Sequence, residues 1–223
     1  LNQQLGSWLL LGVIVTSLPL RDGSGEAAAA TLPAADRCGS CTRCIDACPT
    51  GALLGSRDAA APREMDASRC IAYLTIEKKG AIDEPLRSLM GRQVFGCDIC
   101  QDVCPWNRRA PVTSHGGMAP RRELINPALE VLAGMDGREF KRRFKGSPLE
   151  RTGRKRLLRN VAIAMGNSGD MRFLPQLDDW ANNAGPDPVI DQPIDTTLRE
   201  TAAWARTRIR ALSSSQDAES TKP

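Results

Sequence analysis

Two short cysteine-rich stretches dominate the sequence: residues 38–49 read CGSCTRCIDACP, and residues 97–105 read CDICQDVCP. The first has the spacing C-x2-C-x2-C-x3-C and the second has C-x2-C-x3-C, and a proline follows each. This is the bacterial-type iron–sulfur signature, in which the last cysteine of a run binds the neighbouring cluster. We therefore predict a ferredoxin-like module that holds two [4Fe–4S] clusters.

The same rule assigns all eight cysteines. The first cluster is predicted to be held by Cys38, Cys41, Cys44 and Cys104, and the second by Cys48, Cys70, Cys97 and Cys100. A further C-x2-C partner before Cys97 would fall at position 94, which is Val94, so isolated Cys70 is the remaining thiolate. Two zinc ions or four disulfides are the alternatives, but the repeated spacing with its trailing proline favours clusters, and nothing marks export.

The chain of 223 residues has 41% hydrophobic residues, which suffices for one large or two small domains. No apolar run reaches 18 residues, so no transmembrane helix is expected. The apolar segment 5–20 lacks the basic start of a signal peptide. We interpret it as a buried strand or helix of a domain that begins upstream of Leu1. The small-residue stretch 24–36 is predicted to be a connection or a short helix.

Helical patterns follow the cysteines. Asp66 or Ser68 is a predicted N-cap between the two cysteine groups. Past residue 120, apolar residues recur at helical spacing over 157–165, with an end near Gly166-Asn167, and again from Thr196 or Thr197 onward. A further helix is expected after Asp170. Short amphipathic helices in series are typical of HEAT-like hairpins.

Positive charge is concentrated in one block. From residue 138 to 159 there are ten Lys or Arg and only two Glu, although the whole chain has a net charge of +4. Such a block indicates either a polyanionic partner or a solvated helix face.

Several stretches together resemble the epoxyqueuosine reductase family. They are CGSCTRCIDACPTGAL at 38–53, RCIAYLTIEKKGAI at 69–82 and GRQVFGCDICQDVCPWN at 91–107. GSWLLLG at 6–12 and LLRNVAIAMGNSGD at 157–170 are similar as well. Members of this family use cobalamin and two [4Fe–4S] clusters to reduce epoxyqueuosine to queuosine at the wobble position of tRNA. In the family the isolated cysteine is also a cluster ligand.

The resemblance implies an α+β fold in four parts. Residues 1–33 would be the remnant of a cobalamin-binding domain, 34–115 the two-cluster ferredoxin-like domain, 116–212 a helical HEAT-like domain, and 213–223 a disordered tail. The family's proton-donating aspartate is expected in the missing N-terminal part, so no catalytic residue is assigned here.

The resemblance also implies cofactors, partners and contacts. Cobalamin is expected near Ser7, Ser68, Cys97 and Asp98. Contacts to tRNA are expected at Thr75, Lys78, Lys79, Arg154, Lys155 and Arg156. The protein would be a cytoplasmic monomer that receives electrons from an external donor and has no membrane partner.

Three other functions are compatible with the cysteines. One is a stand-alone electron-transfer ferredoxin with a helical docking domain. The others are a relative of corrinoid reductive dehalogenases and a tRNA-binding scaffold with structural clusters. The basic block favours the tRNA-modifying enzyme over an electron carrier, and a dehalogenase normally has an export signal.

Overall fold

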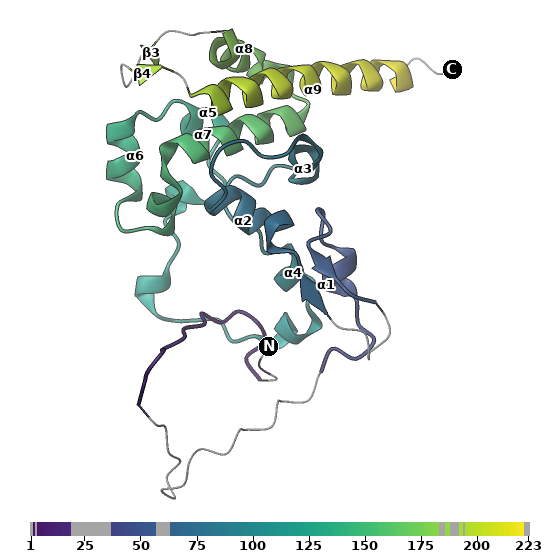
Figure 1. The fold of residues 1–223 in the computed structure, drawn as a ribbon, viewed down its shortest axis with the longest axis vertical. Helices are drawn as coiled ribbons and strands as arrows, with labels where there is room; N and C mark the ends of the chain where they lie inside the picture. The colour runs from purple at the N-terminus through teal and green to yellow at the C-terminus, as the bar shows by residue number, and fades with distance from the viewer. Residues whose placement is uncertain are drawn as a thin grey trace, which may run out of the picture.

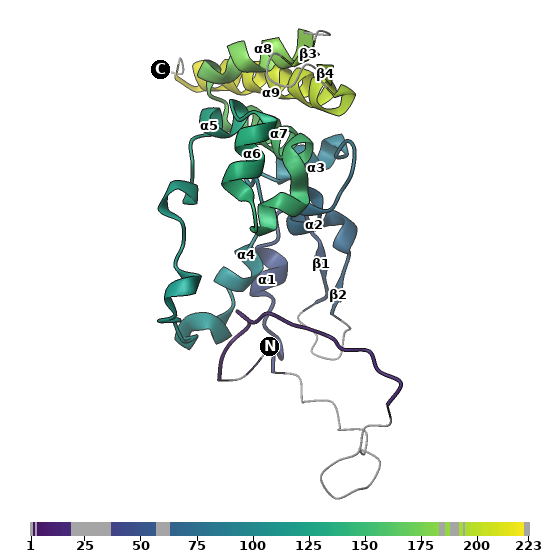
Figure 2. The same cartoon turned by 90° about the vertical axis from the view of Figure 1, so that its left-hand side faces the viewer.

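The computed structural model describes residues 2, 4–18, 37–56, 63–182, 186–187, 192–193 and 195–220. Figure 1 shows an elongated molecule with the cysteine-bearing segments towards one end and a stack of helices at the other. A 90° turn shows the same succession of layers in Figure 2. The small-residue stretch 24–36 lies outside the described residues.

The cysteine-bearing part consists of short elements. Their order is α1 (Arg43–Asp46), β1 (Leu53–Leu54), β2 (Glu64–Met65), η1 (Ala67–Arg69), α2 (Ile71–Ile76), α3 (Glu84–Leu89), α4 (Ile99–Asp102) and η2 (Pro105–Arg109). Strands β1 and β2 form an antiparallel pair. The Asp66 side chain accepts a hydrogen bond from the Ser68 backbone N–H, so of the two predicted caps Asp66 is the one observed.

The second part is helical. Its elements are η3 (Gly116–Met118), η4 (Arg122–Leu124), α5 (Leu129–Ala133), α6 (Gly137–Phe144), α7 (Pro148–Ser168), η5 (Met171–Phe173), α8 (Leu174–Asn182), β3 (Pro186–Asp187), β4 (Gln192–Pro193) and α9 (Thr196–Ser220). We predicted an α+β fold, and the described residues are mostly helical, with two 2-stranded sheets.

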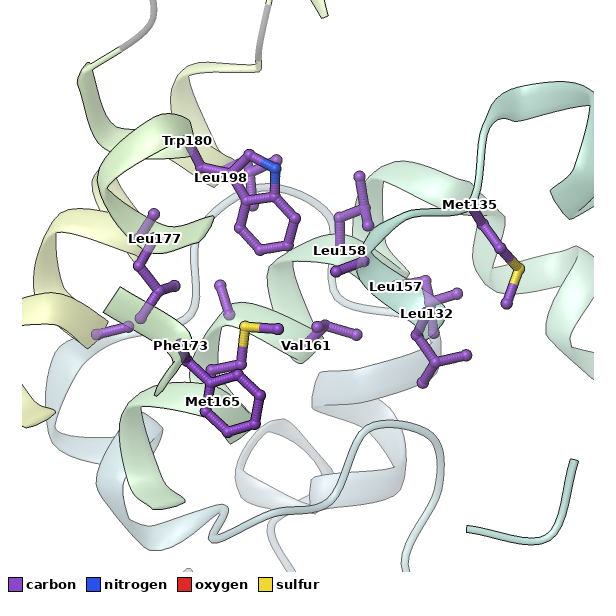
Figure 3. Close-up of a cluster of buried hydrophobic side chains, with 14 of the residues drawn as sticks. Leu132, Met135, Leu157, Leu158, Val161, Met165, Phe173, Leu177, Trp180 and Leu198 are labelled. Atoms are coloured by element: carbon purple, nitrogen blue, oxygen red, sulfur yellow. The ribbon is translucent and has the colours of Figure 1, made fainter. Parts of the chain in front are cut away.

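Helix α7 is the centre of the structure. Gly153, at φ 73°, breaks its helical geometry near the start, and Gly169 ends it in the left-handed conformation. The helix therefore ends at Ser168, one residue after the Gly166-Asn167 pair at which its end is predicted. Figure 3 shows α7 side chains packed with those of α5, η5, α8 and α9. The predicted apolar faces of α7 and α9 are confirmed, because all of their predicted residues are buried: Leu157, Leu158, Val161, Ala162, Met165, Leu198, Ala202, Ala205 and Ile209.

The opposite side of α7 packs against the cysteine-bearing part. Ile163 joins a second buried cluster whose other members come from α2, α3 and the segments beside them: Ile71, Leu74, Ile82, Leu86 and Met90. Because α7 is buried on both sides, it couples the helical layer to the segments that carry the cysteines.

Two predictions about the ends are wrong for the described residues. The apolar N-terminal segment, expected to be buried, has no helix or strand between residues 8 and 16, and Leu10, Leu11 and Ile14 are more than 90% exposed. No described element packs over these side chains, and apolar residues are buried only where another surface covers them. At the other end, α9 continues to Ser220, through most of the predicted disordered tail 213–223, because no glycine or proline interrupts it before Pro223. Within the described ranges, no helix is long and apolar enough to cross a membrane.

Candidate metal centre

The two cysteine runs fold in the same way. In each, a loop leads into a one-turn helix that contains one cysteine, Cys44 in α1 and Cys100 in α4. A further cysteine follows each helix: the Cys48 N–H donates to Ile45 O at 3.2 Å, and the Cys104 N–H donates to Gln101 O at 3.1 Å. Helices α1 and α4 contact each other, so the two runs lie side by side (Figures 1 and 2). All eight cysteines are partly buried, and the structure has no disulfide among them.

The four cysteines predicted to hold the second cluster lie close enough to interact electrostatically. Burial raises the pKa of the Cys97 thiol, and the neighbouring Cys70 and Cys48 raise it further. Burial likewise raises the pKa of the Cys100 thiol, with added contributions from Cys97, Cys70 and Cys44. The isolated Cys70, which is 27 positions before Cys97 in the sequence, therefore lies near Cys97 and Cys100 in space, and Cys44 likewise lies near Cys100.

The surroundings of Cys48 suit a thiolate ligand. Burial raises the pKa of its thiol, but hydrogen bonds from the backbone N–H groups of Leu53 and Ala52 outweigh it, and the pKa is lowered overall. The Ala52 N–H lies 3.3 Å from Sγ, and the Thr50 hydroxyl lies 3.7 Å from it. Hydrogen-bond donors of this kind stabilise the charged form of cysteine, which is the form that binds iron.

Within the described stretches, no three or more His, Cys, Asp or Glu side chains are grouped tightly enough to hold one metal ion. A zinc site requires four ligands about 2.0–2.3 Å from a single centre. A cubane binds each thiolate to a different iron, so its ligands stand farther apart. The repeated cysteine spacing with its trailing proline, rather than this geometry, is what favours clusters over zinc.

Three of the residues expected near cobalamin lie on or beside the second cysteine run. The Ser7 hydroxyl donates to Gln101 Oε1 at 3.0 Å, and Gln101 Nε2 lies 3.5 Å from Asp98 Oδ1. Asn107 Nδ2 donates to the Ser7 hydroxyl at 2.8 Å. Sequence reasoning missed Gln101 and Asn107, although both lie within the motif that carries the resemblance. Their polar side chains beside the cysteines were the available signal.

Ser68, the fourth of these residues, is exposed, and its hydroxyl donates to Asp66 Oδ1. It lies two positions before Cys70, and Cys70 interacts with Cys97. The observed contacts of Ser68 are local, since both its N–H and its hydroxyl donate to Asp66 Oδ1.

Four of the residues expected to contact tRNA lie together. Lys79, Arg154, Lys155 and Arg156 line one depression of about 400 Å³ beside α7 and the start of α9. Lys155 is exposed, and its Nζ lies 3.5 Å from Asp195 Oδ2. Arg156 is largely engaged within the chain, because it donates to the backbone carbonyls of Thr152, Glu77 and Arg151. Arg154 also donates to a carbonyl, that of Met135, and Lys78 is half-buried.

The expected contact of Thr75 with tRNA is wrong. Thr75 is fully buried in α2, where its hydroxyl donates to Ile71 O at 2.7 Å and accepts from the Gly96 N–H at 2.9 Å. Both hydrogen-bonding functions of the hydroxyl are used, and no surface leads to it. The contact is implied by the resemblance alone, whereas the position of Thr75 one turn after the buried Ile71 points its side chain inward.

The surroundings of Arg159 also differ from those expected for a member of the basic block. It closes the basic block, yet its side chain is buried. It donates to the carbonyls of Leu74, Lys78 and Gly80 at 2.6–2.8 Å. Burial, with the nearby Arg156 charge, lowers the pKa of Arg159 to about 10, so it remains a cation at neutral pH. Its position inside the apolar run 157–165 was the signal for burial.

Comparison with known proteins supports the prediction of a double-cluster module. Residues 37–107 match the family model for a 4Fe–4S double cluster binding domain. The chain is 46% identical over 163 residues to an epoxyqueuosine reductase of Xanthomonas campestris pv. campestris, covering 73% of this chain and 42% of that one. It is 42% identical over 202 residues to an epoxyqueuosine reductase of Pseudomonas aeruginosa, covering 89% and 51%.

Solved structures agree with these similarities. An epoxyqueuosine reductase from Bacillus subtilis matches with a TM-score of 0.66 and 38% identity, over 79% of this chain and 43% of that one. An epoxyqueuosine reductase solved with an epoxyqueuosine-modified tRNA stem loop matches with a TM-score of 0.65 and 35% identity, over 86% and 48%. The chain thus spans about half the length of the proteins it matches.

Proposed function

Because this chain is a relative of the epoxyqueuosine reductases along most of its own length, we propose that it serves the reduction of epoxyqueuosine to queuosine in tRNA. Its part is to hold two [4Fe–4S] clusters that supply electrons and to bind the RNA. The observation that carries the proposal is the set of eight cysteines within the double-cluster domain.

The proposed ligand sets follow the rule that the last cysteine of each run binds the neighbouring cluster. Cys38, Cys41, Cys44 and Cys104 hold one cluster, and Cys48, Cys70, Cys97 and Cys100 hold the other. The contact of α1 with α4 supports the crossing, since Cys48 and Cys104 each follow one of these helices. The electrostatic proximity of Cys70 and Cys48 to Cys97 supports the second set.

Cobalamin is the proposed acceptor of these electrons. Two observations support a site formed by Ser7, Ser68, Cys97 and Asp98: Gln101 contacts both Ser7 and Asp98, and Ser68 and Asp98 are exposed, so their polar atoms are open to a ligand. Gln101 would hold Ser7 and Asp98 in place. When bound, the cofactor would supply the reducing centre for the epoxide, while these residues orient it. Residues 1–33 would be the part of the cobalamin-binding domain that this chain contains.

The helical part, residues 116–212, is proposed to be HEAT-like and to bind the RNA backbone. Lys78, Lys79, Arg154, Lys155 and Arg156 would supply the positive charge around the depression beside α7. Lys79 and Lys155 carry most of this role, because both are exposed, whereas the arginines donate to backbone carbonyls. Such contacts give an affinity that depends on salt and little on sequence.

Binding of an anticodon stem loop tests the proposal. Lys79→Glu with Lys155→Glu should weaken binding of the epoxyqueuosine-bearing loop at least tenfold at low salt and reduce the slope of log affinity against log salt. Lys141→Glu with Lys145→Glu makes the same charge change at exposed sites outside the depression and should have a much smaller effect. Equal loss in the two variants, or no binding by the unmodified chain, would overturn the RNA-binding role.

A further inference from the structure

The backbone just before Cys97 is held by two buried side chains. The Gly96 N–H donates to the Thr75 hydroxyl at 2.9 Å, and Asn160 Nδ2 donates to Val94 O at 2.9 Å. Thr75 and Asn160 are both fully buried. Thr75 belongs to α2 and Asn160 to α7, so the segment is fixed from two elements.

The same two side chains also fix the segment that carries Cys70. Cys70 is the N-cap residue immediately before α2, and the Thr75 hydroxyl donates to Ile71 O in the first turn of that helix. Asn160 Nδ2 donates to Thr75 O at 2.9 Å as well as to Val94 O. One hydroxyl and one amide therefore connect the backbone after Cys70 with the backbone before Cys97.

The orientation of the Asn160 amide is itself determined. Arg159 Nε and Nη2 lie 3.1 and 2.9 Å from Asn160 Oδ1. A guanidinium group only donates, so this atom of Asn160 must be the oxygen and the amide nitrogen must face Val94 and Thr75. In a flipped amide, the NH2 group would face the Arg159 guanidinium group, and the oxygen would face the carbonyls of Val94 and Thr75.

We propose that Thr75 and Asn160 are positioning residues for the second cluster, which keep Cys97 and Cys70 at the separation that one cubane needs. The proposal rests on the ligand sets given under Proposed function. Side chains that orient metal ligands without touching the metal typically change metal affinity by about 10–100-fold when they are replaced. The change in iron affinity should be confined to the second cluster, because the hydrogen bonds of Thr75 and Asn160 hold none of the ligands of the first cluster.

Release of iron to a chelator tests the proposal. The whole chain, reconstituted with iron and sulfide without oxygen, should carry about eight irons. Thr75→Val removes the hydroxyl but keeps the shape of the side chain. In this variant about half of the iron should leave roughly tenfold faster or more, and the other half should leave at the unmodified rate. Thr75→Ser should restore slow release.

Thr201→Val is the matched control, since Thr201 is also fully buried and its hydroxyl also donates to a carbonyl one turn earlier, but in α9. It should release iron like the unmodified chain. Asn160→Asp, which keeps the acceptor for Arg159 but loses the donor to Val94 O, should reproduce the half-amplitude fast phase independently.

Unchanged release in both Thr75→Val and Asn160→Asp, or faster release of all the iron together, would overturn the positioning role while leaving the proposed function standing. An unmodified chain that takes up no iron and sulfide would overturn both.

Discussion

Replacing Arg159 by methionine tests how the helical part is joined to the cysteine-bearing part. The Arg159 side chain makes hydrogen bonds to four acceptors, which are the carbonyls of Leu74, Lys78 and Gly80 and the Asn160 amide oxygen. No salt bridge to Arg159 occurs in the described ranges, so its buried charge is compensated by backbone carbonyls and by the Asn160 amide oxygen. Arg159→Met fills similar space and leaves these acceptors without that donor.

The magnitude follows from two opposing effects. Each buried acceptor that loses its donor costs about 1–3 kcal/mol. Removing a buried charge regains part of this, because the charge no longer has to be taken out of water. Because four acceptors lose their donor and the relief of the buried charge offsets part of that cost, the net loss in the free energy of unfolding should be about 3–5 kcal/mol. At about 2–4 °C per kcal/mol for a chain of this size, the melting temperature should fall by roughly 6–20 °C.

Urea unfolding followed by circular dichroism gives the measurement, with Arg142→Met as the control. The Arg142 side chain is 81% exposed, and its closest acidic atom is 4.0 Å away, so its removal should change stability by less than about 0.5 kcal/mol. A loss below about 1 kcal/mol for Arg159→Met, or an equal loss in the two variants, would refute the reasoning.

Two further predictions concern α9. The Asp195 carboxylate accepts a hydrogen bond from the Thr197 N–H at 2.8 Å. Burial raises the pKa of Asp195. This hydrogen bond, the hydrogen bonds from the Thr197 and Lys155 side chains and the Lys155 charge outweigh burial, so the pKa is lowered overall. Asp195→Ala should therefore lower the free energy of unfolding by about 1 kcal/mol at neutral pH. Unfolding measured at several pH values should show this loss shrinking as the pH falls below about 3.9 and through the lower pKa of folded Asp195. A loss that grows in acid would contradict this sign. A Cβ on Gly166 would lie 2.8 Å from Ala205 Cα, so Gly166→Ala should destabilise the protein by about 1–3 kcal/mol in thermal unfolding, whereas an open helical site would gain about 1 kcal/mol from the same change.

Local patterns in the sequence were sufficient for part of this structure. The cysteine spacing predicted the double-cluster module, and the family match at residues 37–107 confirms it. The apolar spacing of α7 and α9 predicted which faces are buried, since a helix with one apolar face packs that face inward. The cysteine spacing and the apolar spacing are both local patterns, so each can be recognised without knowing how distant segments pack.

The errors arose where distant segments decide a residue's surroundings. Thr75 was assigned to the RNA-binding surface, but it is covered by α7 and by the segment before Cys97. Arg159 was counted in the basic block, but carbonyls 79–85 positions away surround it. Local spacing could indicate that these side chains face inward, but it could not identify their partners, because those depend on how α2 and α7 pack.

Iron and acid-labile sulfide analysis of the Cys70→Ala variant tests the central claim most directly. The unmodified chain should contain about eight irons and about eight sulfides. Because Cys70 is assigned to the second cluster alone, the variant should keep the first cluster and lose iron from the second, leaving about four to seven irons with matching sulfide. An unmodified chain that carries zinc without sulfide would contradict the cluster assignment, and full iron content in the variant would contradict the role of Cys70.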